Sequence, residues 1–239
     1  MRINNEVSKE TILDMKSIKI TFLVLWAFLF VISATVLADN CASHKVEKTV
    51  DVPKSKMADV TMAAVGMKAP GFKLMDAMGE EHSLSDFKDK YVVLEWVNFD
   101  CPFVKKHYGS ENMQKLQAMH NDEDVVWLSI CSSAPGKQGY FEGKALKERI
   151  AKENSKSDAY LVDANGKVGR MYGAKTTPHM FVIDPNGILI YDGAIDDKPS
   201  TKTADIDGST NYVQWILDSS MKGEEVVKST APYGCSVKY

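Results

Sequence analysis

The sequence predicts an α/β fold in which helices flank a mixed central sheet, with an N-terminal extension in front. Residues 91–97 and 125–130 form two apolar runs with the length of strands that are buried on both faces. A helical pattern follows each run, as in parallel strands joined by crossover helices. Residues 180–184 and 188–192 flank Pro-Asn-Gly, which predicts a hairpin. These patterns indicate parallel strands at the centre of the sheet and an antiparallel edge.

The first elements alternate between strand and helix patterns. Residues 72–76 alternate apolar and polar side chains, which predicts a short strand. Residues 83–87 predict a helical turn before the strand at 91–97, in which Glu95 is the one charged side chain. A helix is predicted over 103–120 from an apolar stripe made of Val104, Tyr108, Met113, Leu116 and Met119.

The later elements continue this alternation up to a final helix. Amphipathic periodicity predicts the helices, and short apolar runs predict the strands. In order after the strand at 125–130, we expect a loop at 132–139, a helix at 144–154, a strand at 159–163, a short helix at 165–172, the hairpin at 180–192 and a helix at 210–221.

The N-terminal segment has the pattern of an export signal. Lys16 and Lys19 accompany an apolar run over 18–38 that ends in Val-Leu-Ala, a pattern that a signal peptidase recognises. An uncleaved membrane anchor is the alternative, because the run is just long enough to span a bilayer. The predicted organisation is a signal peptide or membrane anchor at 1–38, a polar linker at 39–62, a domain at 63–222 and a C-terminal tail at 223–239 that carries Cys235.

The charge and the cysteine content exclude several classes of function. The chain has 29 basic and 32 acidic residues and lacks a basic stripe with interleaved aromatics, so no nucleic-acid partner is predicted. No Cys/His spacing matches a structural zinc site, and neither a metal nor a cofactor is expected. Four cysteines in an exported chain are too few for a disulfide scaffold and favour a small number of functional thiols: Cys41, Cys101, Cys131 and Cys235.

Cys101 is the leading candidate for chemistry. It lies where an apolar strand meets a predicted helix, and Pro102 suits the first helical position. Unpaired N–H groups and the positive end of the helix dipole favour the thiolate there, and the thiolate is the nucleophile. Lys105 and Lys106, one turn further on, would add positive potential.

Several motifs make the chain similar to the thioredoxin superfamily, most of all its redoxin branch of alkyl hydroperoxide reductase/thiol-specific antioxidant type. The resemblance implies a thioredoxin-like fold, a cis Pro178 that faces the active cysteine, and Cys235 as a resolving cysteine on a mobile tail. The residues that carry it are 65–72, 83–94, 176–184 and the ending Pro-Tyr-Gly-Cys-Ser-Val-Lys-Tyr at 232–239.

The strand-to-helix corner that leads to Cys101 departs from the family pattern. Asn98 stands where thioredoxins have a first cysteine and where peroxiredoxins have Thr or Ser, three residues before Cys101-Pro102. Its amide would either donate to the sulfur or to a peroxide, or merely close the turn. Cys131 ends a predicted strand and is interpreted as core, with pairing to Cys101 as the alternative, whereas Cys41 lies in the linker.

Three basic residues have both a structural and a functional interpretation. His179 follows Pro178 and would act as an acid or base near Cys101, or pack the loop. Arg170 would point at the sulfur or form a surface ion pair, and His107 is expected to be a solvated helix residue.

The resulting hypothesis is an exported, periplasmic or otherwise extracytoplasmic, thiol-dependent oxidoreductase with Cys101 as nucleophile. Cys235, Asn98 and Pro178 complete its site. The expected partners are a small hydroperoxide or a protein thiol or disulfide, together with an external thiol reductant, and 18–38 is a candidate membrane attachment. The alternatives are a copper-binding protein that uses Cys101, Cys235 and His179, because two thiolates and an imidazole suit a soft metal, or a catalytically inactive binding module.

Overall fold

The computed structural model describes residues 61–119 and 124–239. The predicted segment 1–38 and nearly all of the linker 39–62 lie outside these ranges. The seven strands of the main sheet are β1 (Lys73–Asp76), β2 (Glu81–Ser83), β3 (Tyr91–Trp96), β4 (Val125–Cys131), β5 (Ala159–Val162), β7 (His179–Ile183) and β8 (Leu189–Gly193). A second sheet pairs β6 (Thr176–Thr177) with β9 (Cys235–Ser236).

Five α-helices and two short 3-10 helices complete these residues. They are η1 (Leu84–Phe87), α1 (Pro102–Gly109), α2 (Asn112–Met119), α3 (Gly143–Lys152), α4 (Lys167–Tyr172), η2 (Thr203–Asp205) and α5 (Tyr212–Met221). No helix in the ranges that the structure describes is both long enough and apolar enough to cross a membrane.

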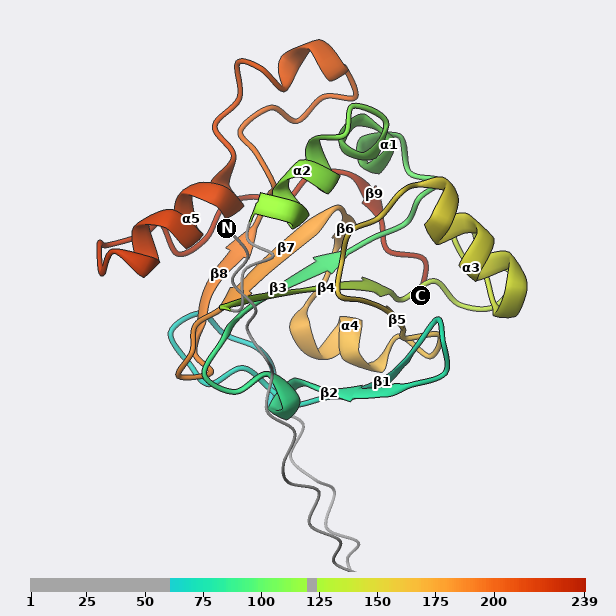
Figure 1. The fold of residues 1–239 in the computed structure, drawn as a ribbon, viewed down its shortest axis with the longest axis horizontal. Helices are drawn as coiled ribbons and strands as arrows, with labels where there is room; N and C mark the ends of the chain where they lie inside the picture. The colour runs from blue at the N-terminus through green and yellow to red at the C-terminus, as the bar shows by residue number, and fades with distance from the viewer. Residues whose placement is uncertain (1–60, 120–123) are drawn as a thin grey trace, which may run out of the picture. The chain divides into compact units, whose positions relative to one another are not determined.

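The main sheet is mixed, and the predicted α/β architecture is confirmed. Its strand order is β2-β1-β5-β4-β3-β7-β8 (Figure 1). The central pairs β3–β4 and β4–β5 are parallel, whereas β7 pairs antiparallel with both β3 and β8. The predicted hairpin is therefore present as β7–β8. The strand β3, which precedes Cys101, lies between β4 and β7.

The predicted helix 103–120 is wrong in one respect, because it is broken into α1 and α2. Ser110 closes α1, and Glu111 adopts a left-handed φ of 59°. The apolar stripe explains the break: Tyr108 and Met113 are five residues apart, whereas one helical face repeats every three or four. Only an interruption lets both side chains reach the same core. The strands β2 and β9, each very short, were also not predicted.

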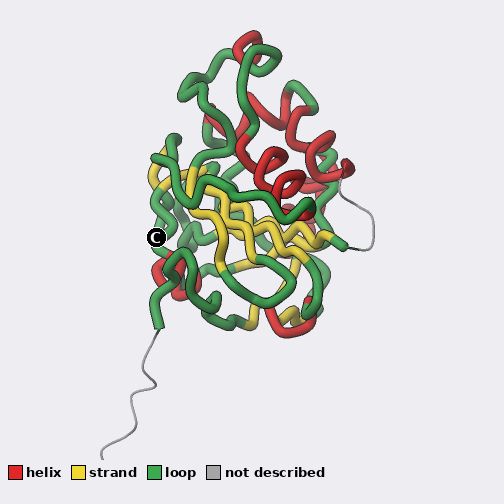
Figure 2. The backbone as a smooth tube through the Cα atoms, turned by 90° about the vertical axis from the view of Figure 1, so that its left-hand side faces the viewer, coloured by secondary structure: helices red, strands yellow, loops and turns green. Residues whose placement is uncertain are grey.

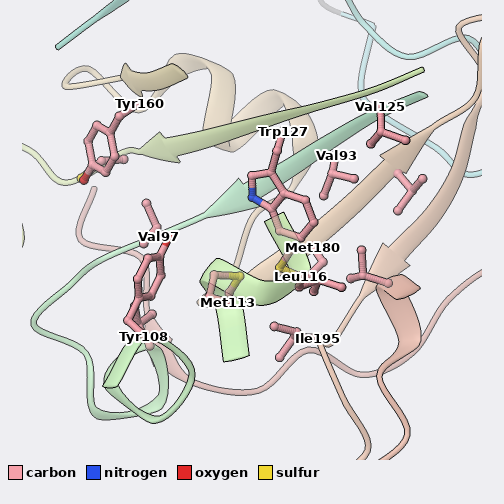
Figure 3. Close-up of a cluster of buried hydrophobic side chains, with 14 of the residues drawn as sticks. Val93, Val97, Tyr108, Met113, Leu116, Val125, Trp127, Tyr160, Met180 and Ile195 are labelled. Atoms are coloured by element: carbon pink, nitrogen blue, oxygen red, sulfur yellow. The ribbon is translucent and has the colours of Figure 1, made fainter. Parts of the chain in front are cut away.

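Each face of the sheet buries its own apolar cluster. On one face, side chains from α1, α2, α3 and α5 pack on the central strands, and Figure 3 shows Met113 and Leu116 beneath Trp127 and Val93. On the other face, the sheet is covered by α4 and by the segment before β1, which contributes Ala69 and Phe72. Figure 2 shows the strands between these helical layers. The site described below therefore rests on a rigid sheet.

Glu95 is the polar exception in the central strand β3, and it is fully buried. Its carboxyl group accepts hydrogen bonds from Tyr108, Gln117, Trp127 and Ser129. Burial raises the pKa of Glu95, and these hydrogen bonds only partly oppose that effect. The carboxyl group of Glu95 thus links α1 and α2 to the sheet and is not itself left unpaired in the core.

Candidate active site

Cys101 is the N-cap residue of α1, directly after the corner that follows β3. Its backbone is extended, with φ −69° and ψ 128°, and Pro102 begins the helix, as the sequence predicts. The backbone N–H of Cys101 donates to the carbonyl oxygen of Asn98 over 2.9 Å and closes the corner. The cysteine is completely buried, so its sulfur lies between the helix start and the segments that cover it.

Cys235 lies beside Cys101 because the C-terminal segment returns to the site as a strand. β9 pairs antiparallel with β6, and the register places Cys235 opposite Thr177 (Figure 1). The thiol of Cys101 donates to the carbonyl oxygen of the same Thr177 over 3.0 Å. A β-carbon at Gly234 would lie 2.1 Å from that oxygen, so glycine is needed for this close approach.

The two thiols influence each other's protonation. Burial, the largest influence, raises the pKa of Cys101, but hydrogen bonds from the Cys235 thiol and from the backbone N–H groups of Val104 and Cys235 outweigh it and lower the pKa. Burial and then the neighbouring Cys101 raise the pKa of Cys235 to about 11. Cys101 is therefore the thiol that ionises first, and Cys235 keeps its proton.

Thr177 is a site residue that the sequence analysis missed. Its hydroxyl group is buried and makes no hydrogen bond within the part of the chain that the structure describes, yet it also lowers the pKa of Cys101. While Cys101 is a thiol, its proton goes to the Thr177 carbonyl oxygen. When Cys101 ionises, the free hydroxyl has a negative acceptor to which it can donate. Its position before Pro178 was the available signal.

Thr177→Val is expected to raise the pKa of Cys101, because valine keeps the shape of the side chain but cannot donate to the thiolate. The measurement is the rate of Cys101 alkylation against pH, followed by mass spectrometry of the reduced protein. Thr177→Ser is the matched control, since it keeps the hydroxyl group and should titrate close to the parent. Identical inflections in the valine and serine variants would show that the hydroxyl has no such role.

The C-terminal segment is packed on the domain, not extended from it as the mobile tail that the sequence suggested. Thr230 pairs with Asp192 by a backbone hydrogen bond, and Val237 donates to the carbonyl of Lys175. The last residue, Tyr239, donates to the carbonyl of Ala174 over 2.8 Å. The sequence did not predict these contacts because the segment has little local periodicity, and they join it to distant residues.

Asn98 closes the corner and is buried. Its side-chain oxygen accepts from the N–H of Asp100 over 2.9 Å, and its amide nitrogen donates to the carbonyl of Gln138 over 3.2 Å. These bonds favour the turn-closing interpretation over a donor to the sulfur. They also tie the corner to the loop 132–139, where Gly139 has a left-handed φ of 86° and approaches Asn98 closely.

The peptide bond between Thr177 and Pro178 is cis, as the resemblance implied. His179 comes next, but its ring belongs to the opposite face of the sheet, against Phe181. Its Nε2 lies 2.6 Å from Asp192, and its Nδ1 accepts from the backbone N–H of Lys175. Among the described residues, His179 therefore does not form a ligand cluster with Cys101 and Cys235, and the structure gives the copper alternative no support.

In the part of the chain that the structure describes, the remaining residues that the sequence analysis singled out interact with groups other than the sulfur of Cys101. Cys131 is buried and its sulfur donates to the carbonyl of Gly139 over 3.5 Å, which favours the core interpretation. Arg170 donates to the carbonyl of Asn165, and its guanidinium lies 4.4 Å from the ring centroid of Tyr239. His107 is fully buried, so its predicted solvated position is wrong. Cys41 lies outside the described residues.

Comparisons with known proteins identify relatives of the chain. The family model named Redoxin matches residues 64–209. The thiol-disulfide oxidoreductase ResA from Geobacillus thermodenitrificans (strain NG80-2) is 28% identical over 127 residues, which is 53% of this chain and 67% of that protein.

Two solved structures share the fold over most of the chain. A hypothetical protein from Sinorhizobium meliloti 1021 has 24% sequence identity and a TM-score of 0.60, over 75% of this chain and 96% of that one. An uncharacterized conserved protein from Geobacillus kaustophilus has 24% identity and a TM-score of 0.63, over 74% and 93%. Since the redoxin model spans more than half of the sequence, the chain belongs to the redoxin family and has a thioredoxin-like fold.

Proposed function

We propose that the protein is an exported thiol–disulfide oxidoreductase in which Cys101 and Cys235 are the redox pair. The observation that carries this proposal is the strand pairing of β9 with β6, which brings Cys235 beside the sulfur of Cys101. The name of the Geobacillus relative, a thiol-disulfide oxidoreductase, supports the same reaction class. The signal-like run at 18–38 supports export, with membrane attachment through that run as the alternative.

The reaction is a two-electron exchange between dithiol and disulfide. The thiolate of Cys101 attacks one sulfur of a partner disulfide, forms a mixed disulfide and releases the partner's other sulfur as a thiolate. The thiolate of Cys235 then attacks the sulfur of Cys101 and releases the second partner thiolate. The partner is reduced by two electrons, and a Cys101–Cys235 disulfide remains. An external thiol reductant restores the dithiol by the reverse exchange.

The effect of each sulfur on the pKa of the other is consistent with this order of steps. While Cys101 is free, burial and the neighbouring Cys101 sulfur raise the pKa of Cys235 to about 11, so Cys235 does not compete as nucleophile. Once Cys101 is held in a mixed disulfide, its negative charge is gone. The hydrogen bond and charge that raised the pKa of Cys235 disappear with it, and Cys235 becomes easier to deprotonate when its attack is needed.

Hydroperoxide reduction is a second reaction open to the same pair. The Cys101 thiolate would take one oxygen from the peroxide to become a sulfenic acid, which releases an alcohol. Condensation with the Cys235 thiol would then release water and form the same disulfide. The side chain of Asn98 accepts from Asp100 and uses one of its two amide N–H donors on Gln138, which holds the amide in the turn. The name of the Geobacillus relative leads us to favour exchange with protein thiols and disulfides over peroxide reduction or an inactive binding role.

The test is non-reducing peptide mapping of the purified protein after exposure to oxidised glutathione. We expect a disulfide-linked pair of peptides that contain Cys101 and Cys235, and its loss after treatment with a dithiol. Cys131→Ser is the control variant, because that thiol is engaged with Gly139 and should leave the pairing unchanged. A map in which Cys101 pairs with Cys131, or stays unpaired, would disprove the proposed redox pair.

A further inference from the structure

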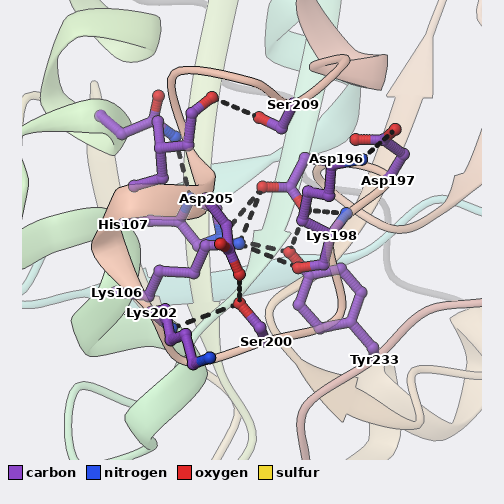
Figure 4. A network of polar contacts seen from close by, with 12 residues as sticks. Lys106, His107, Asp196, Asp197, Lys198, Ser200, Lys202, Asp205, Ser209 and Tyr233 are labelled. Carbon is purple, nitrogen blue, oxygen red and sulfur yellow. Dashed lines mark hydrogen bonds and ion pairs between the residues drawn. The ribbon is translucent and has the colours of Figure 1, made fainter.

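A buried polar network joins the helix that begins at Cys101 to the segment that carries Cys235. Lys106 in α1 and Asp196 after β8 form an ion pair over 3.1 Å, and both side chains are almost completely buried. Tyr233, two residues before Cys235, donates its hydroxyl hydrogen to the same carboxylate (Figure 4). Three segments that are distant in the sequence thus meet at one carboxylate.

The hydrogen bonds of this network have defined directions. The amide nitrogen of Asn112 donates to Nδ1 of His107 over 2.8 Å, so the ring proton lies on Nε2. Nε2 is 3.3 Å from the hydroxyl oxygen of Tyr233 and donates to it. Burial lowers the pKa of His107 to about 4, although Asp196 opposes this, and the ring stays neutral near pH 7. The Tyr233 hydroxyl accepts from His107 and donates to Asp196.

Asp196 in turn is fully engaged. One carboxylate oxygen binds Lys106, and the other accepts from Tyr233 and from the backbone N–H of Lys198. Lys106 also donates to the carbonyl of Lys198 over 2.9 Å. The positive charge of Lys106 is therefore paired with a buried carboxylate. Against the effect of burial, the pKa of Cys101 is lowered by hydrogen bonds and not by Lys106, which corrects the expectation from the sequence.

We propose that Lys106, Asp196 and Tyr233 form a clasp that holds Cys235 over Cys101 and controls access to the nucleophile. The inference rests on the proposed redox role of Cys101 and Cys235, and it makes these three residues positioning residues, since none of them touches the reacting sulfurs. Cys101 is completely buried, so a partner reaches its sulfur only when the segment around Cys235 moves away. The clasp sets how often that happens.

The position of Tyr233 suits such control. Besides its hydrogen bond to Asp196, its ring packs edge-on against Phe103, with the ring centroids 5.7 Å apart. Phe103 lies two residues after Cys101, and Tyr233 lies two residues before Cys235. The contact between the two rings therefore helps to position both cysteines, since each ring is two residues away from its cysteine in the sequence. Detaching Tyr233 would leave a buried carboxylate and a buried lysine with fewer partners, which opposes opening.

The test measures how fast iodoacetamide alkylates Cys101 in the reduced protein. Tyr233→Phe keeps the ring contact with Phe103 but removes the hydrogen bond to Asp196. We expect alkylation of Cys101 to become about tenfold faster, the factor for one lost hydrogen bond to a charged group, because alkylation tracks the open population. The alkylation of Cys131 in the same sample should not change, since that thiol is buried in the core.

Tyr172→Phe is the matched control variant. It removes another tyrosine hydroxyl group, which is buried and donates to the carbonyl of Pro70 on the other face of the sheet. The clasp is disproved if Tyr233→Phe leaves Cys101 as slow as in the parent, or if Cys131 or the control variant accelerates to the same extent. Peptide mapping of the oxidised parent separates this outcome from failure of the redox pair itself, which would overturn both proposals.

Discussion

Cys101→Ser is expected to lower the rate of disulfide reduction by at least about a thousandfold, because a serine hydroxyl is not ionised near neutral pH and is a poor nucleophile. Cys235→Ser is expected to stop the cycle at a later point. Cys101 would still attack a partner disulfide, but the mixed disulfide would accumulate because only the external reductant, and no neighbouring thiol, resolves it. The measurement is turnover of a small aromatic disulfide with a dithiol reductant.

Mass spectrometry distinguishes the two variants. The Cys235→Ser protein should carry the adduct of one partner sulfur on Cys101, whereas Cys101→Ser should carry none. Cys131→Ser is the control, and it should turn over at a rate close to that of the parent. Parental turnover by Cys235→Ser would disprove the resolving role and indicate that an external thiol completes the cycle.

Lys106→Met is expected to destabilise the reduced protein by about 3–5 kcal/mol, because it leaves the buried carboxylate of Asp196 without its cation. For a domain of this size, the loss corresponds to a fall in melting temperature of about 10 °C. The measurement is thermal or urea unfolding in the presence of a reductant, so that a Cys101–Cys235 disulfide does not mask the effect.

Lys105→Met provides a control one residue away. Lys105 is exposed on the same helix, so its replacement should change the free energy of unfolding by no more than about 0.5 kcal/mol. Equal stability of the Lys105 and Lys106 variants would mean that the ion pair with Asp196 contributes little, and that other contacts hold the C-terminal segment.

The sequence by itself determined the architecture and the position of Cys101 at the start of a helix, because both depend on patterns within a few residues. The apolar runs at 91–97 and 125–130 predicted the central parallel strands, and Pro-Asn-Gly predicted the hairpin β7–β8. The junction of strand and helix placed Cys101 at the start of α1. Such features follow from side-chain periodicity and from the local conformational preferences of proline and glycine.

The tertiary structure decided what surrounds Cys101. Thr177 contacts Cys101 across 76 residues of sequence, and Lys106 meets Asp196 across 90. A single sequence contains no periodicity that links positions so far apart, and it cannot show that a polar side chain becomes buried. Lys106 and His107 therefore had the sequence pattern of an exposed helix face, and the segment before Cys235 that of a mobile tail. Lys106 and His107 become buried, and the C-terminal segment becomes packed, only when three distant segments fold against one another. Each segment then supplies the charge or hydrogen bond that the others need.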